Sequence, residues 1–190
     1  MKEIYAQYDG AAIRVYQAYR AGIAEEAVRL QAFGEQFSRT RMTWIKPSFL
    51  WMMYRAGWGV KKDQEHILAI DLDRGAFETL LRQAVLTSPC GKDPGDWRQA
   101  LDASPVRVQW DPDRKPDGTP IGRPALQMGI KAAALSAYLD GIVRITDITP
   151  QVHKWDAQRH AGRLDKAALP SERIYPMTDP AVRARLAMDE

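Results

Sequence analysis

Apolar and polar residues follow one another in the first third of the chain in a way that predicts two strand-helix units. Ile13–Tyr19 is rich in β-branched and aromatic residues and predicts a strand. From Ala21 to Phe33 the apolar residues recur at helical spacing, which predicts a helix. Met42–Lys46 predicts a second, short strand, because the residue before a proline is held out of the helical region. Pro47 suits the first turn of a following helix, which should end at Gly57.

The rest of the chain predicts further strands and helices in mixed order. His66–Leu72 is an almost continuous apolar run and predicts a buried strand, followed by a helix over Arg74–Leu86 and then a loop of Ser, Pro, Gly and Asp residues. Later segments predict a strand at Val106–Trp110, an exposed hairpin connection at Asp111–Pro120, a strand at Arg123–Ile130, a helix at Ala132–Leu139 and a strand at Ile142–Thr149.

This order of elements predicts an α+β fold. With 190 residues the chain is long enough for one domain, which we expect over residues 1–166. After Pro150 the periodic pattern weakens, and further prolines at 170, 176 and 180 interrupt any long element. We therefore expect residues 167–190 to be a C-terminal extension or tail, which either wraps the domain or stays loose.

Composition excludes several classes of protein. The single cysteine, Cys90, excludes a disulfide framework and a cysteine-rich metal site. The three histidines do not have the spacing of metal ligands, so no metal site is predicted. No apolar run of about 18 residues or more occurs, and the N-terminus has no apolar signal segment. We expect a cytoplasmic protein that does not enter a membrane.

Charge is distributed unevenly around a net charge of +3. The segment from Gln36 to Lys62 contains no Asp or Glu, yet it contains six Lys or Arg residues and three tryptophans, at positions 44, 51 and 58. A basic, aromatic segment can attract an anionic ligand and stack on a planar one.

On the predicted helix after Pro47, three residues fall on one narrow face at 100° per residue: Ser48, Trp51 and Arg55. Ser48 could bind an anion or a carboxamide oxygen at the helix N-terminus, or it could be an ordinary N-cap. Trp51 and the preceding Trp44 could stack on a ligand, or they could be core residues. Lys46 and Arg55 could be ligand contacts or solvated charges.

Glutamines on two predicted strands are further candidates. Alternation places Gln127 opposite the apolar face of its strand, where it could face a ligand or a neighbouring strand. Tyr16 and Gln17 point in opposite directions, so only one of them can face a given cleft. No GxSxG, P-loop or GxGxxG motif occurs in the chain.

Three stretches resemble the domain-of-unknown-function 4291 family. They are Val15–Tyr19, Met42–Trp58 and Leu126–Ile130, followed by Asp147–Thr149. This resemblance covers most of the chain and implies no activity by itself.

A more distant resemblance is to the ADP-ribosyltransferase fold, and it implies split antiparallel β-sheets with flanking helices and NAD as a substrate. In that fold a first strand carries a His or Arg, a second leads through a Ser into an aromatic helix, and a late strand carries a catalytic Glu. The resemblance implies NAD-binding roles for Tyr16, Gln17, Trp44, Lys46, Ser48, Trp51, Arg55 and Arg123, with Gln127 at the catalytic position.

Two glutamines depart from the family pattern, since Gln17 replaces the His and Gln127 replaces the Glu. Gln17 can still hydrogen-bond a ribose, but an amide at position 127 cannot act as a general base. Either another carboxylate substitutes, for which Glu65, Asp71 and Asp147 are candidates, or the domain binds NAD-like ligands without turnover.

Two functions follow as hypotheses. In the first, Trp44 and Trp51 line a nicotinamide pocket, and ADP-ribose is transferred to a nucleic-acid base or a protein. In the second, the chain is a non-catalytic nucleic-acid or nucleotide-binding module that uses the basic, tryptophan-rich segment. If instead the tryptophans are core residues, the function lies elsewhere.

Overall fold

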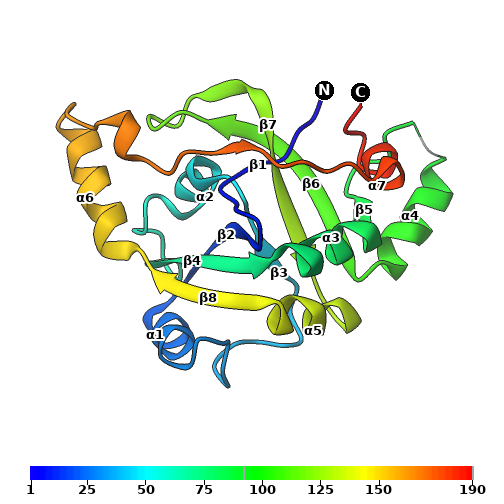
Figure 1. Ribbon diagram of the computed structural model, residues 1–190, viewed down its shortest axis with the longest axis horizontal. Coiled ribbons are helices and arrows are strands. Elements are labelled where there is room, and N and C mark those ends of the chain that lie inside the picture. The colour runs from blue at the N-terminus through cyan, green and yellow to red at the C-terminus, as the bar shows by residue number, and fades with distance from the viewer. Residues whose placement is uncertain (92, 190) are drawn as a thin grey trace.

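Most strands of this protein belong to two antiparallel sheets, which a computed structural model describes for residues 1–91 and 93–189 (Figure 1). The first sheet has the order β2-β4-β8, and its strands are Ala12–Tyr19, His66–Asp73 and Ile142–Asp147. The second has the order β3-β7-β6-β5, and its strands are Thr43–Ile45, Pro120–Ile130, Val106–Arg114 and Ala84–Leu86. Neighbouring strands are antiparallel except β5 and β6, which are parallel.

Helices flank the sheets. They are α1 (Ala21–Leu30), α2 (Phe49–Ala56), α3 (Arg74–Gln83), α4 (Pro94–Ala103), α5 (Ala133–Asp140), α6 (Thr149–His160) and α7 (Pro180–Arg185), with a 3₁₀ turn at Lys166–Ala168. The chain is thus one mixed α/β domain of antiparallel sheets with flanking helices, which confirms the predicted fold class.

The hydrophobic core lies between the two sheets. Alternate residues of each strand face it, including Val15 and Ile70 in the first sheet and Val108, Leu126 and Met128 in the second. This is the period of two that strands impose, and it leaves the opposite face of β7 free for polar residues such as Gln127.

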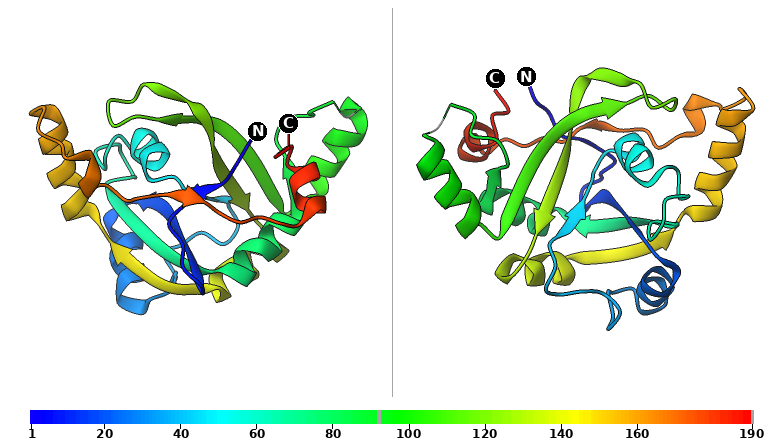
Figure 2. Two further views of the ribbon diagram at one scale, coloured as in Figure 1. Left: turned by 45° about the horizontal axis from the view of Figure 1, so that its top comes forward. Right: turned by 180° about the vertical axis from the view of Figure 1, so that it is seen from behind.

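The sheets meet at one short backbone bridge. Tyr16 on β2 and Lys46, just after β3, exchange hydrogen bonds: Tyr16 N donates to Lys46 O (2.8 Å) and Lys46 N to Tyr16 O (3.2 Å). The right-hand view of Figure 2 shows β2 and β3 coming together beside α2. Beyond this bridge the strands diverge, and the separation between them positions the candidate site.

The C-terminal residues wrap the domain, which resolves the alternative that the sequence left open. The short strands β1 (Tyr5–Ala6) and β9 (Arg173–Ile174) pair antiparallel, and the apolar side chains of Tyr175, Met177 and Leu186 are buried in the main core.

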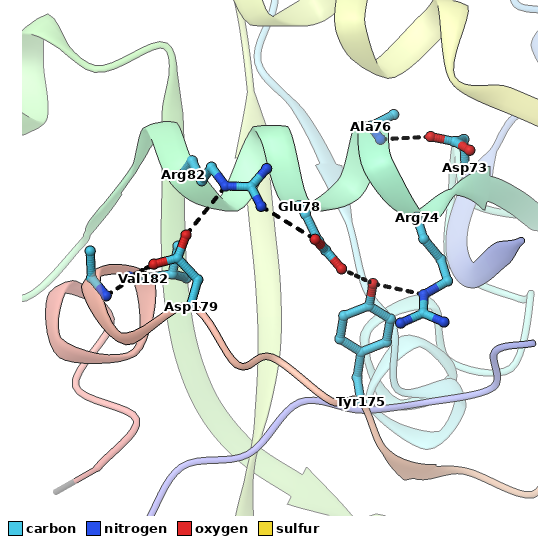
Figure 3. Close-up of polar contacts among 9 residues, drawn as sticks. Asp73, Arg74, Ala76, Glu78, Arg82, Tyr175, Asp179 and Val182 are labelled. Carbon is cyan, nitrogen blue, oxygen red and sulfur yellow. Dashed lines mark hydrogen bonds and ion pairs between the residues drawn. The ribbon is translucent and has the colours of Figure 1, made fainter. Parts of the chain in front are cut away.

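Polar contacts along α3 also hold this segment in place (Figure 3). Tyr175 Oη donates to Glu78 (2.8 Å) and accepts from Arg74 (3.1 Å), while Arg82 donates to Asp179 (3.3 Å).

Several predicted boundaries are wrong for identifiable reasons. The helix predicted to reach Leu86 ends at Gln83, because Ala84–Leu86 pairs with β6 as β5. The predicted loop contains α4, whose N-cap Asp93 accepts from Gly95 N and Asp96 N. After Pro150, where the pattern weakens, the chain forms a further helix, α6, with this proline in its first turn.

Two further boundaries differ near the site. Pro47 precedes the helix that it was expected to begin, because Ser48 is the N-cap of α2, whereas Gly57 ends α2 as predicted with a φ of 58°. The hairpin connection is shorter than expected, since β6 continues to Arg114.

Candidate functional site

A cavity of about 730 Å³ opens where β2 and β3 diverge. Its walls come from the end of β2, from β3, from the loops around residues 36–42 and 63–64, and from Met52 of α2. This volume lies within the range of about 300–1,000 Å³ that small-molecule sites usually have. The cavity therefore has room for a nucleotide-sized ligand.

Two strand edges border this opening. The backbone N–H and C=O of Tyr16 are hydrogen-bonded to those of Lys46, which joins the two strands. In a strand, the N–H and C=O groups of every second residue point to the same side. The peptide groups of Ala18 and Trp44 therefore face the gap, and the carbonyl of Trp44 is reached there by a side chain, Gln17 Nε2, at 3.2 Å. A ligand with neighbouring donor and acceptor atoms could bind such edges as an added strand does.

Gln17 links β2 to β3 through a buried hydrogen-bond network. Its Nε2 donates to Thr43 Oγ1 (2.7 Å) and to the Trp44 carbonyl, while its Oε1 accepts from Tyr138 Oη (2.6 Å). Tyr19 Oη and Thr43 Oγ1 share a further hydrogen bond of 3.0 Å. Because both amide hydrogens of Gln17 are already donated, its main role is to hold β2 and β3 at a set separation.

Lys46 is one of the residues that line the cavity, and it is almost fully buried. The residue is only 7% exposed, and among the described residues its Nζ has no hydrogen-bond or ion-pair partner. The pKa of Lys46 is lowered from 10.5 to about 8, chiefly by burial and also by the positive charge of Arg55, while the charge of Asp111 acts in the opposite direction. At neutral pH the amine is mostly charged, with an accessible neutral form.

Trp44 forms an aromatic wall of the same cavity. Its indole lies against Gly129 of β7, where a Cβ would come within 2.9 Å of the ring and 2.6 Å of Met42 Sδ. Glycine at position 129 is therefore what lets the half-buried indole lie close to the sheet while it borders the cavity.

Gln127 lies on the sheet face that also carries Trp44 and Lys46, but it does not line the cavity. It is 9% exposed, and its Nε2 donates to Asp111 Oδ2 at 2.6 Å. Asp111 Oδ1 accepts from Gln109 Nε2 (2.8 Å). Gln127 thus has the cross-strand partner that was one of the two alternatives.

Asp111 is a site residue that the sequence did not reveal. The pattern assigned it to an exposed turn, whereas it belongs to β6, one strand away from Gln127, and its charge acts on Lys46. All three proposed substitutes have other partners: Asp71 pairs with Arg14 (2.7 Å), and Asp147 contacts His66 at 3.0 Å. Glu65 accepts from Asp63 N (2.9 Å).

Carboxylates of the chain itself occupy the N-terminus of α2. Ser48 is an N-cap whose Oγ accepts from Trp51 N (3.3 Å) and donates to Asp113 Oδ1 (2.9 Å). Phe49 N donates to Glu172 Oε1 (2.6 Å). The anion that the sequence led us to expect there is therefore supplied internally, and the N-cap alternative for Ser48 is confirmed.

Arg123 is engaged by the same carboxylates. Its guanidinium donates to Asp113 Oδ2 (2.8 Å) and to Glu172 Oε2 (3.1 Å). The pKa of Glu172 is raised from 4.5 to about 7, chiefly by burial and also by the nearby Asp113, while Phe49 N and Arg123 oppose the rise. This cluster joins the C-terminal segment to α2 and lies outside the cavity wall.

Other predicted binding residues are packed elsewhere. Trp51 is 4% exposed and stacks on Tyr54 with centroids 5.5 Å apart, and the guanidinium groups of Arg55 and Arg114 lie 6.0 Å and 5.5 Å from the centroid of its ring. Tyr16 packs edge-on against Phe49, and its Oη donates to Gln7. The expectation that Trp51 lines a pocket with Trp44 is wrong, because this helix face packs against β6 instead of opening into the cavity.

Fold and site together define a mixed α/β domain with a polar cavity between the edges of two antiparallel sheets. Residues 3–175 match the family described as "Domain of unknown function (DUF4291)", and the chain belongs to this family. No curated protein matches the sequence. Among the helices of residues 1–91 and 93–189, none has both the length and the apolar character needed to cross a bilayer.

Proposed function

We propose that this protein is an ADP-ribosyltransferase-like enzyme that binds NAD in the cavity between β2 and β3 and transfers ADP-ribose to an acceptor. The observation that carries this proposal is that Gln17, Trp44 and Lys46 share one cavity wall. These residues come from the first two motifs of the resemblance, and they are distant in sequence.

The chemistry of the wall suits the parts of NAD. The indole of Trp44 offers a stacking surface for nicotinamide or adenine. The strand edges at Ala18 and Trp44 offer backbone donors and acceptors to a carboxamide. Lys46 offers a cation to the pyrophosphate, together with Arg20 and Arg41 on the same wall. In this arrangement Arg20 and Arg41 contact the pyrophosphate, whereas Arg55 and Arg123, to which the resemblance gave NAD-binding roles, have contacts elsewhere.

ADP-ribosyl transfer needs a carboxylate near the ribose. The bond between nicotinamide and C1 of the ribose breaks, its electron pair leaves with nicotinamide, and positive charge develops on the sugar. We propose that Asp111, which is hydrogen-bonded to Gln127, stabilises this charge at a distance: it does not line the cavity, but its own charge reaches Lys46 in the cavity wall. The acceptor then forms the new bond to C1 and loses its proton.

The alternative is a nucleotide-binding or nucleic-acid-binding module without catalysis. It is favoured by one observation, namely that neither Asp111 nor Gln127 lines the cavity wall, whereas three cations do. Such a module would bind its ligand with strong salt dependence and release no nicotinamide.

The test is a titration with NAD followed by intrinsic tryptophan fluorescence, combined with an assay for released nicotinamide. We expect saturable quenching that is lost in Trp44→Phe and kept in Trp97→Phe, because Trp97 packs on the far edge of the second sheet at Leu86. Asp111→Asn should still bind NAD but release nicotinamide at least about 100-fold more slowly. An unchanged signal at millimolar NAD would contradict the proposal, and binding without release would support the non-catalytic module.

A further inference from the structure

The amine of Lys46 has an environment that favours the neutral, nucleophilic form of lysine. It is buried, it lacks an ion-pair partner among the described residues, and a second cation, Arg55, acts on it. A lysine that is desolvated or placed beside another cation is activated as a nucleophile toward carbonyl groups. Lys61 and Lys62, by contrast, are exposed on the loop after α2.

The cavity that Lys46 lines also contains side chains that can bind a sugar. Amide groups of Gln36 and Gln64 and the hydroxyl of Ser38 can exchange hydrogen bonds with sugar hydroxyls. The face of an indole, here Trp44, packs well against the C–H groups of a sugar ring. Arginines of the same wall, Arg20 and Arg41, are suited to a phosphate.

We propose that Lys46 forms a Schiff base with the aldehyde of a phosphorylated aldose bound in this cavity. Nζ of the neutral amine adds to the carbonyl carbon, and a proton moves from nitrogen to oxygen to give a carbinolamine. Loss of water then forms the C=N bond, so the carbonyl oxygen and two hydrogens of the amine leave together. No oxidant, reductant or metal ion is needed for this step.

This activity is independent of the reaction with NAD, because NAD carries both of its riboses as glycosides and has no free aldehyde. The two proposals share the cavity and its residues Trp44, Lys46, Arg20 and Arg41, but they differ in ligand and in reaction. If both hold, NAD should protect Lys46 from an aldehyde, since one ligand would exclude the other.

The experiment is reductive trapping on the full-length protein. Ribose 5-phosphate is added with sodium cyanoborohydride at pH 7.5, and the modified lysines are quantified by peptide mass spectrometry over a range of sugar concentrations. We expect Lys46 to react at least about tenfold faster than Lys61 and Lys62, because a larger fraction of its amine is neutral at that pH. Its rate should saturate with sugar concentration, whereas the rates of the exposed lysines should rise linearly.

Controls separate the parts of the proposal. Ribose without its phosphate should react with Lys46 at a lower rate and without saturation in the same range, which would assign the phosphate contact. Lys46→Arg should remove the fast phase while keeping the charge, and Lys61→Arg should leave it unchanged. If Lys46 is labelled fast and saturably, and NAD does not reduce this labelling, the result would support the Schiff-base proposal and contradict NAD as a ligand of the cavity. Labelling of Lys46 that is no faster than that of Lys61 would overturn the Schiff-base proposal.

Discussion

Replacing Lys46 by Met should stabilise the folded protein at neutral pH. The change keeps an unbranched side chain of similar length and removes a charge that burial disfavours. Because the pKa of Lys46 falls from 10.5 to about 8 on folding, the charged form costs about 3 kcal/mol at 1.36 kcal/mol per pKa unit. No ion pair among the described residues is lost to offset this gain.

The sign of the effect depends on pH in a defined way. Because the pKa of Lys46 is lower in the folded state than in the unfolded state, the free-energy cost of burying its charge is fully present below pH 8. This cost decreases as pH rises from 8 to 10.5, and it is absent above pH 10.5. Urea unfolding of both proteins should therefore show Lys46→Met more stable by up to about 3 kcal/mol at pH 7, with a difference that shrinks toward pH 10.

The matched control is Lys61→Met, which changes an exposed lysine and should alter stability by about 0.5 kcal/mol or less. If Lys46→Met is as stable as the parent at pH 7, or less stable, then Lys46 is not a desolvated amine, and no enhanced reactivity toward aldehydes is expected of it. A variant that is more stable but no longer binds ligand would indicate that this lysine is kept for function at a cost in stability.

Three further changes test other parts of the site. Gln17→Leu should destabilise the fold by about 2–4 kcal/mol in urea unfolding, because it leaves Tyr138 Oη, Thr43 Oγ1 and the Trp44 carbonyl without their shared partner; a loss below about 1 kcal/mol would contradict the bracing role. Gly129→Ala should displace the Trp44 indole, with a loss of about 1–3 kcal/mol and a changed tryptophan emission spectrum, whereas Gly122→Ala, whose Cβ would meet no atom within 4 Å, should change neither. Glu172→Gln should be more stable than the parent by up to about 3 kcal/mol above pH 7 and equal to it below pH 4.5, because a folded-state pKa raised from 4.5 to about 7 means that the parent loses stability as pH rises through this range. The control is Glu25→Gln, on the exposed side of α1. A stability difference that does not change with pH would refute this interpretation of Glu172.

Local patterns in the sequence were sufficient for most of the elements around the site. The apolar runs of β2, β4 and β7, the proline after Lys46 and the glycine that ends α2 all act through neighbouring residues, so they could be interpreted without knowledge of the fold. The resemblance implied one pocket for Gln17, Trp44 and Lys46 together with Ser48, Trp51 and Gln127, and of these six only the first three line the cavity.

Contacts between distant segments decided the rest. The sequence could not show that Asp111 would lie one strand from Gln127, because a turn-rich segment became part of β6 only through its pairing with β7. Nor could it show that Ser48 and Arg123 would be engaged by Asp113 and Glu172, since Glu172 reaches α2 only when the C-terminal segment wraps the domain.

The burial of the basic, aromatic segment was likewise a tertiary outcome. Helical spacing placed Ser48, Trp51 and Arg55 on one face, but spacing alone does not distinguish a face that binds a ligand from one that packs on a sheet. Sequence determined which residues share a face, because that follows from backbone geometry. Only the folded structure determined what covers that face, and it left Lys46 as the buried charge without a partner among the described residues.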